Sequence, residues 1–126
     1  MKILFLDDEI DRVNIFRKNN PEVSVCHVTN FSDFLDAVKE DNFDLFMLDH
    51  DLGSDVYTGT SAAAYLAFNK PIIGDGKNVI IHSANPIGAT NMMSQFKHTD
   101  HINVYVVAFG WTKVFIENDT INIKNI

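Results

Sequence analysis

Three short apolar segments of the sequence each end in polar side chains that can carry out acid–base or metal chemistry. Carboxylates, imidazoles, a hydroxyl and an amide follow directly on segments 3–6, 45–48 and 79–81; they are Asp7, Asp8, Asp49, His50, Asp51, His82, Ser83 and Asn85. Apolar runs without alternation are typical of strands that a parallel sheet buries on both faces. Because open α/β sheets bind ligands at the carboxyl ends of their strands, we expect these side chains to share one site.

Asp7, Asp8 and Asp49 are candidate ligands of a divalent cation. If the strands that carry them are neighbours, about 5 Å apart, their carboxylates repel one another unless a hard cation binds between them. Mg²⁺ commonly takes one or two carboxylates, keeps several waters and contacts a substrate phosphate. The sequence therefore predicts a site for Mg²⁺ (or Mn²⁺). Helix capping by Asp8 or solvated loop acids are the alternative.

Two histidines occupy comparable positions, since His50 directly follows one central strand and His82 ends another. An imidazole, with an ordinary pKa of about 6.5, acts as a base or an acid near neutral pH. Two hydrogen-bonded structural histidines are the alternative interpretation. His27, His98 and His101 lack a comparable context, and solvated or core positions are expected for them.

Hydrophobic periodicity and turn residues predict the elements that position these groups. Strands are expected over 2–7, 23–28, 44–49, 79–82 and 104–109. Helices are expected over 9–19, after a cap at Asn30 or Ser32, from Thr58–Thr60 to Phe68, and over 86–97. The loop 50–58 contains Gly53, a candidate for a positive φ angle. The stretch 71–77 contains two glycines and a proline and is expected to be a surface connection.

The C-terminal segment has a different pattern. Residues 114–117 and 120–123 alternate with period two around Asn118-Asp119, which indicates a β-hairpin where a helix would complete a five-fold βα repeat. We therefore predict a doubly wound α/β domain over 1–126, with a core of 1–109 and a C-terminal β-extension of 110–126. A helix over 112–118 is the alternative.

Composition limits the function. The 126 residues are 46% hydrophobic and carry a net charge of −7, which argues against duplex DNA or an anionic membrane as the main partner. Cys26 is the only cysteine, which excludes an intrachain disulfide, and a buried inert thiol is expected. The N-terminal apolar run is too short for a signal peptide or a membrane span, so a cytoplasmic protein is expected.

Asp7-Asp8, Asp49, Gly59 and Ser83-Ala84 resemble the acidic pair, phosphoacceptor aspartate, glycine and hydroxyl-Ala pair of response-regulator receiver domains. The resemblance covers about residues 1–109 and implies a flavodoxin-like sheet of strand order 2-1-3-4-5 that binds Mg²⁺. Receiver domains have a Lys-Pro directly after strand five, whereas residues 106–110 contain no lysine and Lys113 arrives late.

The strings Leu48-Asp-His-Asp-Leu-Gly53 and His82-Ser-Ala-Asn-Pro-Ile-Gly-Ala89 more closely resemble the cyclic-phosphate-processing receiver family, which phages often encode. The resemblance implies a phosphoesterase, located in the host cytoplasm if the chain is phage-encoded. Its substrate would be a small phosphorylated ligand such as a cyclic nucleotide or an RNA 2′,3′-cyclic phosphate end. The implied catalytic residues are His50, His82 and Asp49, and the implied substrate-binding residues are Asp51, Ser83, Asn85 and Gly53.

Two other functions are compatible with the same residues. Asp49 could accept a phosphoryl group in a two-component-type signalling pathway, although the missing strand-five lysine counts against this. Alternatively, the domain could be a non-catalytic receiver-like module that binds a protein or a nucleotide. Trp111 and Tyr57 could stack on a base, and core or rim positions are the alternative for both.

Overall fold

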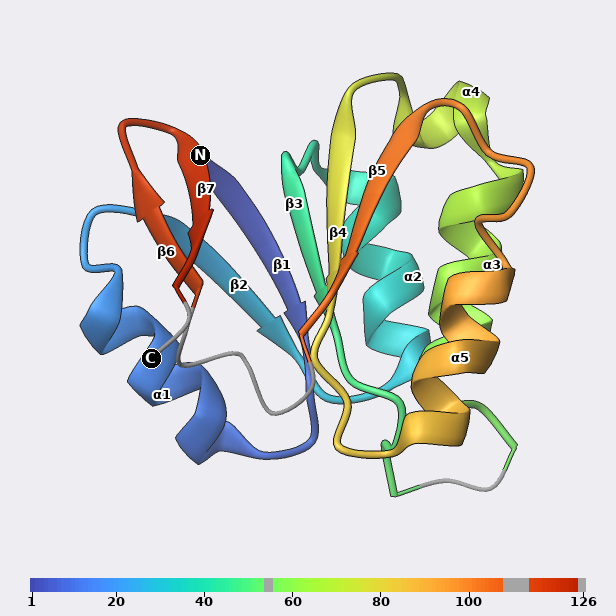
Figure 1. Ribbon diagram of the computed structural model, residues 1–126, viewed down its shortest axis with the longest axis horizontal. Coiled ribbons are helices and arrows are strands. Elements are labelled where there is room, and N and C mark those ends of the chain that lie inside the picture. The colour runs from blue at the N-terminus through green and yellow to red at the C-terminus, as the bar shows by residue number, and fades with distance from the viewer. Residues whose placement is uncertain (54–55, 108–113, 125–126) are drawn as a thin grey trace.

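The computed structural model describes residues 1–53, 56–107 and 114–124 of the chain, and its centre is a five-stranded parallel sheet (Figure 1). The strand order is β2-β1-β3-β4-β5, as predicted. The strands are β1 (Lys2–Leu6), β2 (Ser24–Val28), β3 (Leu45–Leu48), β4 (Lys77–Ile81) and β5 (Ile102–Val106). All residues of β3 are buried, which confirms that its unbroken apolar run marks a strand covered on both faces.

Helices connect the strands, and two of them begin at caps that the sequence suggested. They are α1 (Ile10–Asn19), α2 (Phe31–Glu40), α3 (Gly59–Phe68), α4 (Lys70–Ile73) and α5 (Pro86–Ser94). The Asn30 side chain accepts a hydrogen bond from the Asp33 amide, and Thr58 caps α3. The stretch 71–77 is not only a loop, because Pro71 stands in the first turn of α4, where its missing N–H costs nothing. Helix α5 ends at Ser94, before the predicted end at 97.

The two faces of the sheet carry different layers. Helices α2, α3 and α5 cover one face, and α1 covers the other (Figure 1). Strand side chains alternate between these layers: Ile3 and Phe5 pack with α1, whereas Leu4 and Leu6 pack with the other helices. This alternation decides on which side of the sheet each residue at a strand end must lie. Among the described residues, no helix is long and apolar enough to cross a bilayer.

A β-hairpin packs beside α1, where a regular receiver would have its last helix. Strands β6 (Val114–Glu117) and β7 (Thr120–Ile123) are antiparallel, and Val114 is buried in the α1-side core. Asn118 and Asp119 have φ angles of 52° and 57°, as a two-residue hairpin turn requires. The predicted hairpin is confirmed, and the alternative helix is wrong for residues 114–118. The boundary at 109/110, Trp111 and Lys113 lie outside the described residues.

Strand β5 begins earlier than predicted, at Ile102 rather than Val104. Parallel pairing with β4 starts at Lys77 and Ile102, so polar Asn103, opposite Asn78, is part of the ladder. The apolar content of 104–109 placed the prediction too late, because a backbone ladder accepts polar residues at the edge of a sheet. Residues 108 and 109 lie outside the described part of the chain.

Candidate functional site

Asp7, Asp49 and His82 stand side by side at the carboxyl edge of the sheet. Leu6 is level with Leu48 in the strand register, and Leu48 is level with Ile81. The ladder continues one residue further, since the Asp49 amide donates to the Leu6 carbonyl and the His82 amide donates to the Leu48 carbonyl, each at 3.0 Å. The three side chains therefore follow one another across β1, β3 and β4 on the α1 face.

Three carboxylates meet at this edge. One oxygen from each of Asp7, Asp8 and Asp49 lies within 4.8 Å of the others; Asp7 and Asp49 are buried and Asp8 is exposed. Burial, followed by the charge of Asp7, raises the pKa of Asp49 to about 7. Burial also raises the pKa of Asp7 above its usual value. An all-oxygen donor set with one solvent-facing member suits Mg²⁺ or Mn²⁺, so these residues fit the predicted cation.

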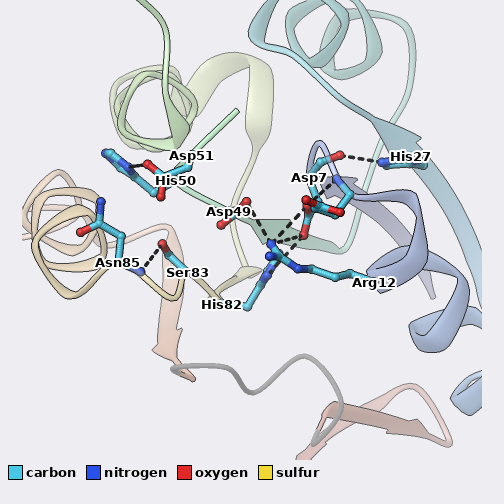
Figure 2. Close-up of polar contacts among 10 residues, drawn as sticks. Asp7, Arg12, His27, Asp49, His50, Asp51, His82, Ser83 and Asn85 are labelled. Carbon is cyan, nitrogen blue, oxygen red and sulfur yellow. Dashed lines mark hydrogen bonds and ion pairs between the residues drawn. The ribbon is translucent and has the colours of Figure 1, made fainter. Parts of the chain in front are cut away.

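Arg12 is a member of this cluster that sequence analysis missed. Its Nη1 lies 3.5 Å from both carboxylate oxygens of Asp7 and 3.4 Å from Asp49 Oδ2 (Figure 2). Helix α1 starts at Ile10, so Arg12 lies in its first turn, directly beyond the end of β1. This position, in the first helical turn after an acidic strand end, is the sequence signal that could have identified Arg12 as part of the site. The guanidinium partly balances two buried carboxylates and is itself one-third exposed.

His82 is fully enclosed beside the acids. Its side chain has no exposed area, its ring packs against Phe5 at 5.0 Å between centroids, and Nδ1 lies 3.8 Å from Asp7 Oδ2. Neither ring nitrogen has a hydrogen-bond partner within the described part of the chain. Burial, with a further contribution from the positive charge of Arg12, lowers the pKa of His82 to about 3. The imidazole is therefore neutral near pH 7.

His50 lies on the other side of the edge, so the structure does not bring the two predicted catalytic histidines together. Its Nδ1 is 2.9 Å from Asp51 Oδ1, and the side chain is 15% exposed (Figure 2). The ring rests on Gly88 in the first turn of α5, where an added Cβ would lie 2.4 Å from His50 Cγ. Because α5 covers the face opposite α1, the imidazole of His50 and that of His82 belong to opposite layers.

Of the predicted substrate-binding residues, Ser83 is buried, Asn85 is partly exposed, and Asp51 and Gly53 are exposed. The backbone N–H of Asn85 donates to Ser83 Oγ at 3.0 Å, and Asn85 Oδ1 accepts from the backbone N–H of Gly88. Both side chains therefore help to start α5. Asp51 is mostly exposed. Gly53 has the predicted positive φ, +70°, and an added Cβ would lie 3.8 Å from Asp8 Oδ2.

Gly59 fixes the backbone that carries Asp49. Its amide donates to the His50 carbonyl at 2.9 Å, and a Cβ at this position would lie 2.0 Å from the Asp49 carbonyl oxygen. Tyr57, half-exposed, stacks on Phe31 at 5.1 Å and is therefore a rim residue. His27 and His101 bond to the backbone carbonyls of Asp7 and Leu66, as expected for structural histidines.

An apolar hollow of about 270 Å³ opens beside Ser83. Pro86, Ala89 and Met93 from α5 line it together with Ala84 and Val106. A larger hollow of about 400 Å³ lies at the other end of α5, around Lys70, His98 and Asp100. Of these two hollows, the smaller one includes Ser83, the residue after His82, and is therefore the one that can hold part of a ligand bound at this edge.

Solved structures share this fold. A response regulator from Burkholderia pseudomallei with a phosphorylated aspartic acid, calcium ion and citrate is 15% identical, with a TM-score of 0.63 over 83% of this chain and 58% of that one. The response regulator DrrB from Thermotoga maritima is 17% identical, with a TM-score of 0.63 over 86% and 45%. A CheY-like receiver domain from Methanospirillum hungatei is 16% identical, with a TM-score of 0.61 over 83% and 78%. The chain thus spans about half the length of the first two.

The fold and the acidic edge define the class: the chain is a receiver-like domain with a β-hairpin in place of the last helix. The family model described as "Cyclic-phosphate processing Receiver domain" matches residues 2–98. The chain belongs to this family. No curated protein sequence matches it significantly.

Proposed function

We propose that this protein is a metal-assisted phosphoesterase that opens cyclic phosphates, either in a cyclic nucleotide or at an RNA 2′,3′-cyclic phosphate end. The observation that carries the proposal is the cluster of Asp7, Asp8 and Asp49, with oxygens within 4.8 Å, in a member of the cyclic-phosphate processing receiver family. These three residues would hold Mg²⁺ or Mn²⁺. The bound ion would supply charge neutralisation for the phosphate oxygens.

His50 is the group we assign to proton transfer. It is partly exposed, and Asp51 fixes its ring orientation, as the carboxylate does in acid–base pairs of enzymes. In the proposed hydrolysis, water forms a bond to phosphorus and gives its proton to His50. The phosphorus–oxygen bond to the sugar breaks, and His50 returns the proton to that oxygen. His82 has no exposed area and therefore takes no part in this exchange with solvent or substrate.

Arg12 and Ser83 provide contacts for the substrate phosphate. Arg12 already reaches the acidic edge, and its guanidinium can form two parallel hydrogen bonds with phosphate oxygens. Ser83 lines the apolar hollow of about 270 Å³, which has room for a base or a ribose next to the phosphate. This arrangement favours a nucleotide over inorganic or aliphatic phosphates.

A panel of 2′,3′- and 3′,5′-cyclic nucleotides and cyclic-phosphate RNA ends, incubated with the protein and Mg²⁺ or Mn²⁺, tests the proposal. Mass spectrometry should detect a gain of one water in at least one substrate, and Asp49→Asn and added EDTA should abolish it. His50→Gln should slow turnover by about 10²–10⁴-fold while leaving metal affinity unchanged. Ligand binding without turnover across the whole panel would favour a binding module instead.

A phosphoacceptor receiver is the second candidate, because buried Asp49 directly follows β3 and the Burkholderia response regulator contains a phosphorylated aspartic acid. The sequence has no lysine in 106–110 to stabilise the phosphorylated state. We therefore expect a small-molecule phosphodonor to leave little long-lived phospho-Asp49 in an intact-mass spectrum. A stable phosphoprotein that changes its oligomeric state would support the signalling function.

A further inference from the structure

His82 is a buried polar side chain without a partner, placed beside a cluster of metal-binding groups. Both of its ring nitrogens lack a hydrogen bond, and of the side chains that the structure describes only Thr60 shares this condition. Buried polar groups in folded proteins are almost always paired, because an unpaired group loses its hydration without compensation. A neutral imidazole without a hydrogen bond therefore indicates a partner that the described residues do not provide.

The imidazole lies between the apolar core and the carboxylates, because its ring packs against Phe5 while Nδ1 points toward Asp7. Its Nδ1 lies 3.8 Å from Asp7 Oδ2, which is too long for a hydrogen bond. Two ligand atoms of one octahedral ion, each about 2.1 Å from the metal, are separated by about 3.0 Å when adjacent and about 4.2 Å when opposite. The observed separation is longer than the adjacent value and shorter than the opposite one, so the two side chains must shift slightly to bind one ion. His82 also lies beside Asp49, one strand further across the sheet. The line of side chains Asp7, Asp49 and His82 therefore ends in a nitrogen donor.

Building on the metal-assisted phosphoesterase proposed above, we propose that His82 binds the same cation as Asp7 and Asp49 through Nδ1. The site then contains oxygen and nitrogen donors and prefers Mn²⁺, Co²⁺ or Zn²⁺ over Mg²⁺. Carboxylates and water suit Mg²⁺, whereas imidazole suits later transition metals, whose affinities for nitrogen-containing sites rise along the Irving–Williams series. His82 is thus a ligand that sets metal selectivity.

A different explanation is that His82 is structural and closes a hydrogen bond to a protonated Asp7 after a small movement. This alternative predicts no bond between nitrogen and metal and no preference for transition metals. The two explanations therefore differ in a property that is measured on the wild-type protein, without any substitution.

The decisive experiment is pulsed electron paramagnetic resonance of Mn²⁺ bound to the wild-type protein, together with calorimetric titrations of Mg²⁺, Mn²⁺ and Co²⁺. We expect a ¹⁴N coupling from a directly bound imidazole, and tighter binding of Mn²⁺ and Co²⁺ than of Mg²⁺. His82→Gln should remove the coupling and weaken Co²⁺ binding by at least about 10–100-fold, with Mg²⁺ affinity changed much less. His98→Gln, the same substitution at an exposed histidine, should match the wild type.

Wild-type Mn²⁺ binding without a ¹⁴N coupling would overturn the inference and leave a phosphoesterase that uses Mg²⁺ intact. A coupling that persists in His82→Gln would also overturn it, because another nitrogen would then be the ligand. Absence of binding of every divalent ion to the wild type would instead remove the proposed metal site itself. If His82→Gln does not fold, the wild-type spectrum and metal preference decide.

Discussion

Arg12 in α1 reaches Asp49 at the end of β3, with 3.4 Å between Nη1 and Oδ2. The same nitrogen is 3.5 Å from Asp7, so one guanidinium serves two buried carboxylates. These separations exceed those of a tight charge-assisted hydrogen bond, which are about 2.7–2.9 Å. The guanidinium thus lies near both acids without a short hydrogen bond to either. It must compete for their carboxylates with any metal cation that binds there.

Removing the charge of Arg12 tests this competition. Arg12→Gln should raise the affinity of the substrate-free protein for Mn²⁺ by about tenfold, equivalent to about 1.4 kcal/mol, because a competing positive charge is lost. The same change should weaken binding of inorganic phosphate in the presence of metal. Arg17→Gln is the matched control, since Arg17 lies on the same helix and donates to the Val25 carbonyl. Weaker Mn²⁺ binding in Arg12→Gln would contradict the competition.

Metal affinity should depend on pH through Asp49. Burial and the charge of Asp7 raise the pKa of Asp49 to about 7, so below that pH a cation must displace a proton. Apparent affinity should therefore rise about tenfold per pH unit up to pH 7 and level off above it. Calorimetry at pH 6 in two buffers of different ionisation enthalpy should show release of about one proton. Release that is as large at pH 8 would show that another group titrates.

The stability of the metal-free protein should respond to pH in two opposite ways. The raised pKa of Asp49 gives a contribution that is complete below the unfolded-state pKa of 3.8 and is lost as the pH rises through about 7. The lowered pKa of His82 gives a contribution that is complete above 6.5 and is lost as the pH falls through about 3. Between about pH 4 and 6.5 the two partly cancel.

Asp49→Asn separates these two contributions. The variant should gain stability over the wild type as the pH rises from 4 to 8, up to about 4 kcal/mol for a shift of about three pKa units. Urea unfolding with EDTA at pH 4.5, 6 and 8 measures the difference. Asp11→Asn, which removes an exposed acid of α1, is the control and should show no such trend. An equal gain at all three pH values would exclude Asp49 as the titrating group.

Gly88 provides the space that holds His50. A Cβ at this position would lie 2.4 Å from His50 Cγ, so Gly88→Ala should displace the imidazole from Asp51. We expect turnover to fall at least about tenfold with metal affinity unchanged. Asn91→Ala, at an exposed position three residues further along α5 and away from the hollow, should retain full turnover. Unchanged turnover in a folded Gly88→Ala variant would remove His50 from the proposed proton transfer.

Asn20 joins α1 to the C-terminal hairpin. Its buried side-chain amide donates to the carbonyls of Phe16 and Val114, and its oxygen accepts from the Ile116 amide at 2.7 Å. Asn20→Ala removes three hydrogen bonds and should lower the free energy of unfolding by about 3 kcal/mol. Asn122→Ala, which removes an exposed contact within the hairpin, should cost less than about 0.5 kcal/mol. Equal losses in urea unfolding would contradict the joining role.

The local pattern of the sequence was sufficient for much of this molecule. Unbroken apolar runs predicted the central strands, Asn118-Asp119 predicted the hairpin turn, and the acids after β1 and β3 predicted one carboxylate cluster. The strands and the turn depend on residues close together in the chain, whereas the cluster also required the strands that carry Asp7 and Asp49 to be neighbours. The strand order followed from the family resemblance, and the structure confirmed it.

Tertiary structure decided which groups meet at the edge. Arg12 joins Asp49 only because α1 packs across the sheet and turns that side chain toward β3, a relationship between residues 37 apart in the sequence. The sequence also grouped His50 with His82, because both follow strands. Side chains of consecutive strand residues point to opposite faces, so His82 shares the face of Asp49, and His50, one residue beyond Asp49, lies with α5. Register between strands is set by pairing and by the cores on both faces, which is why it appears only in the folded chain.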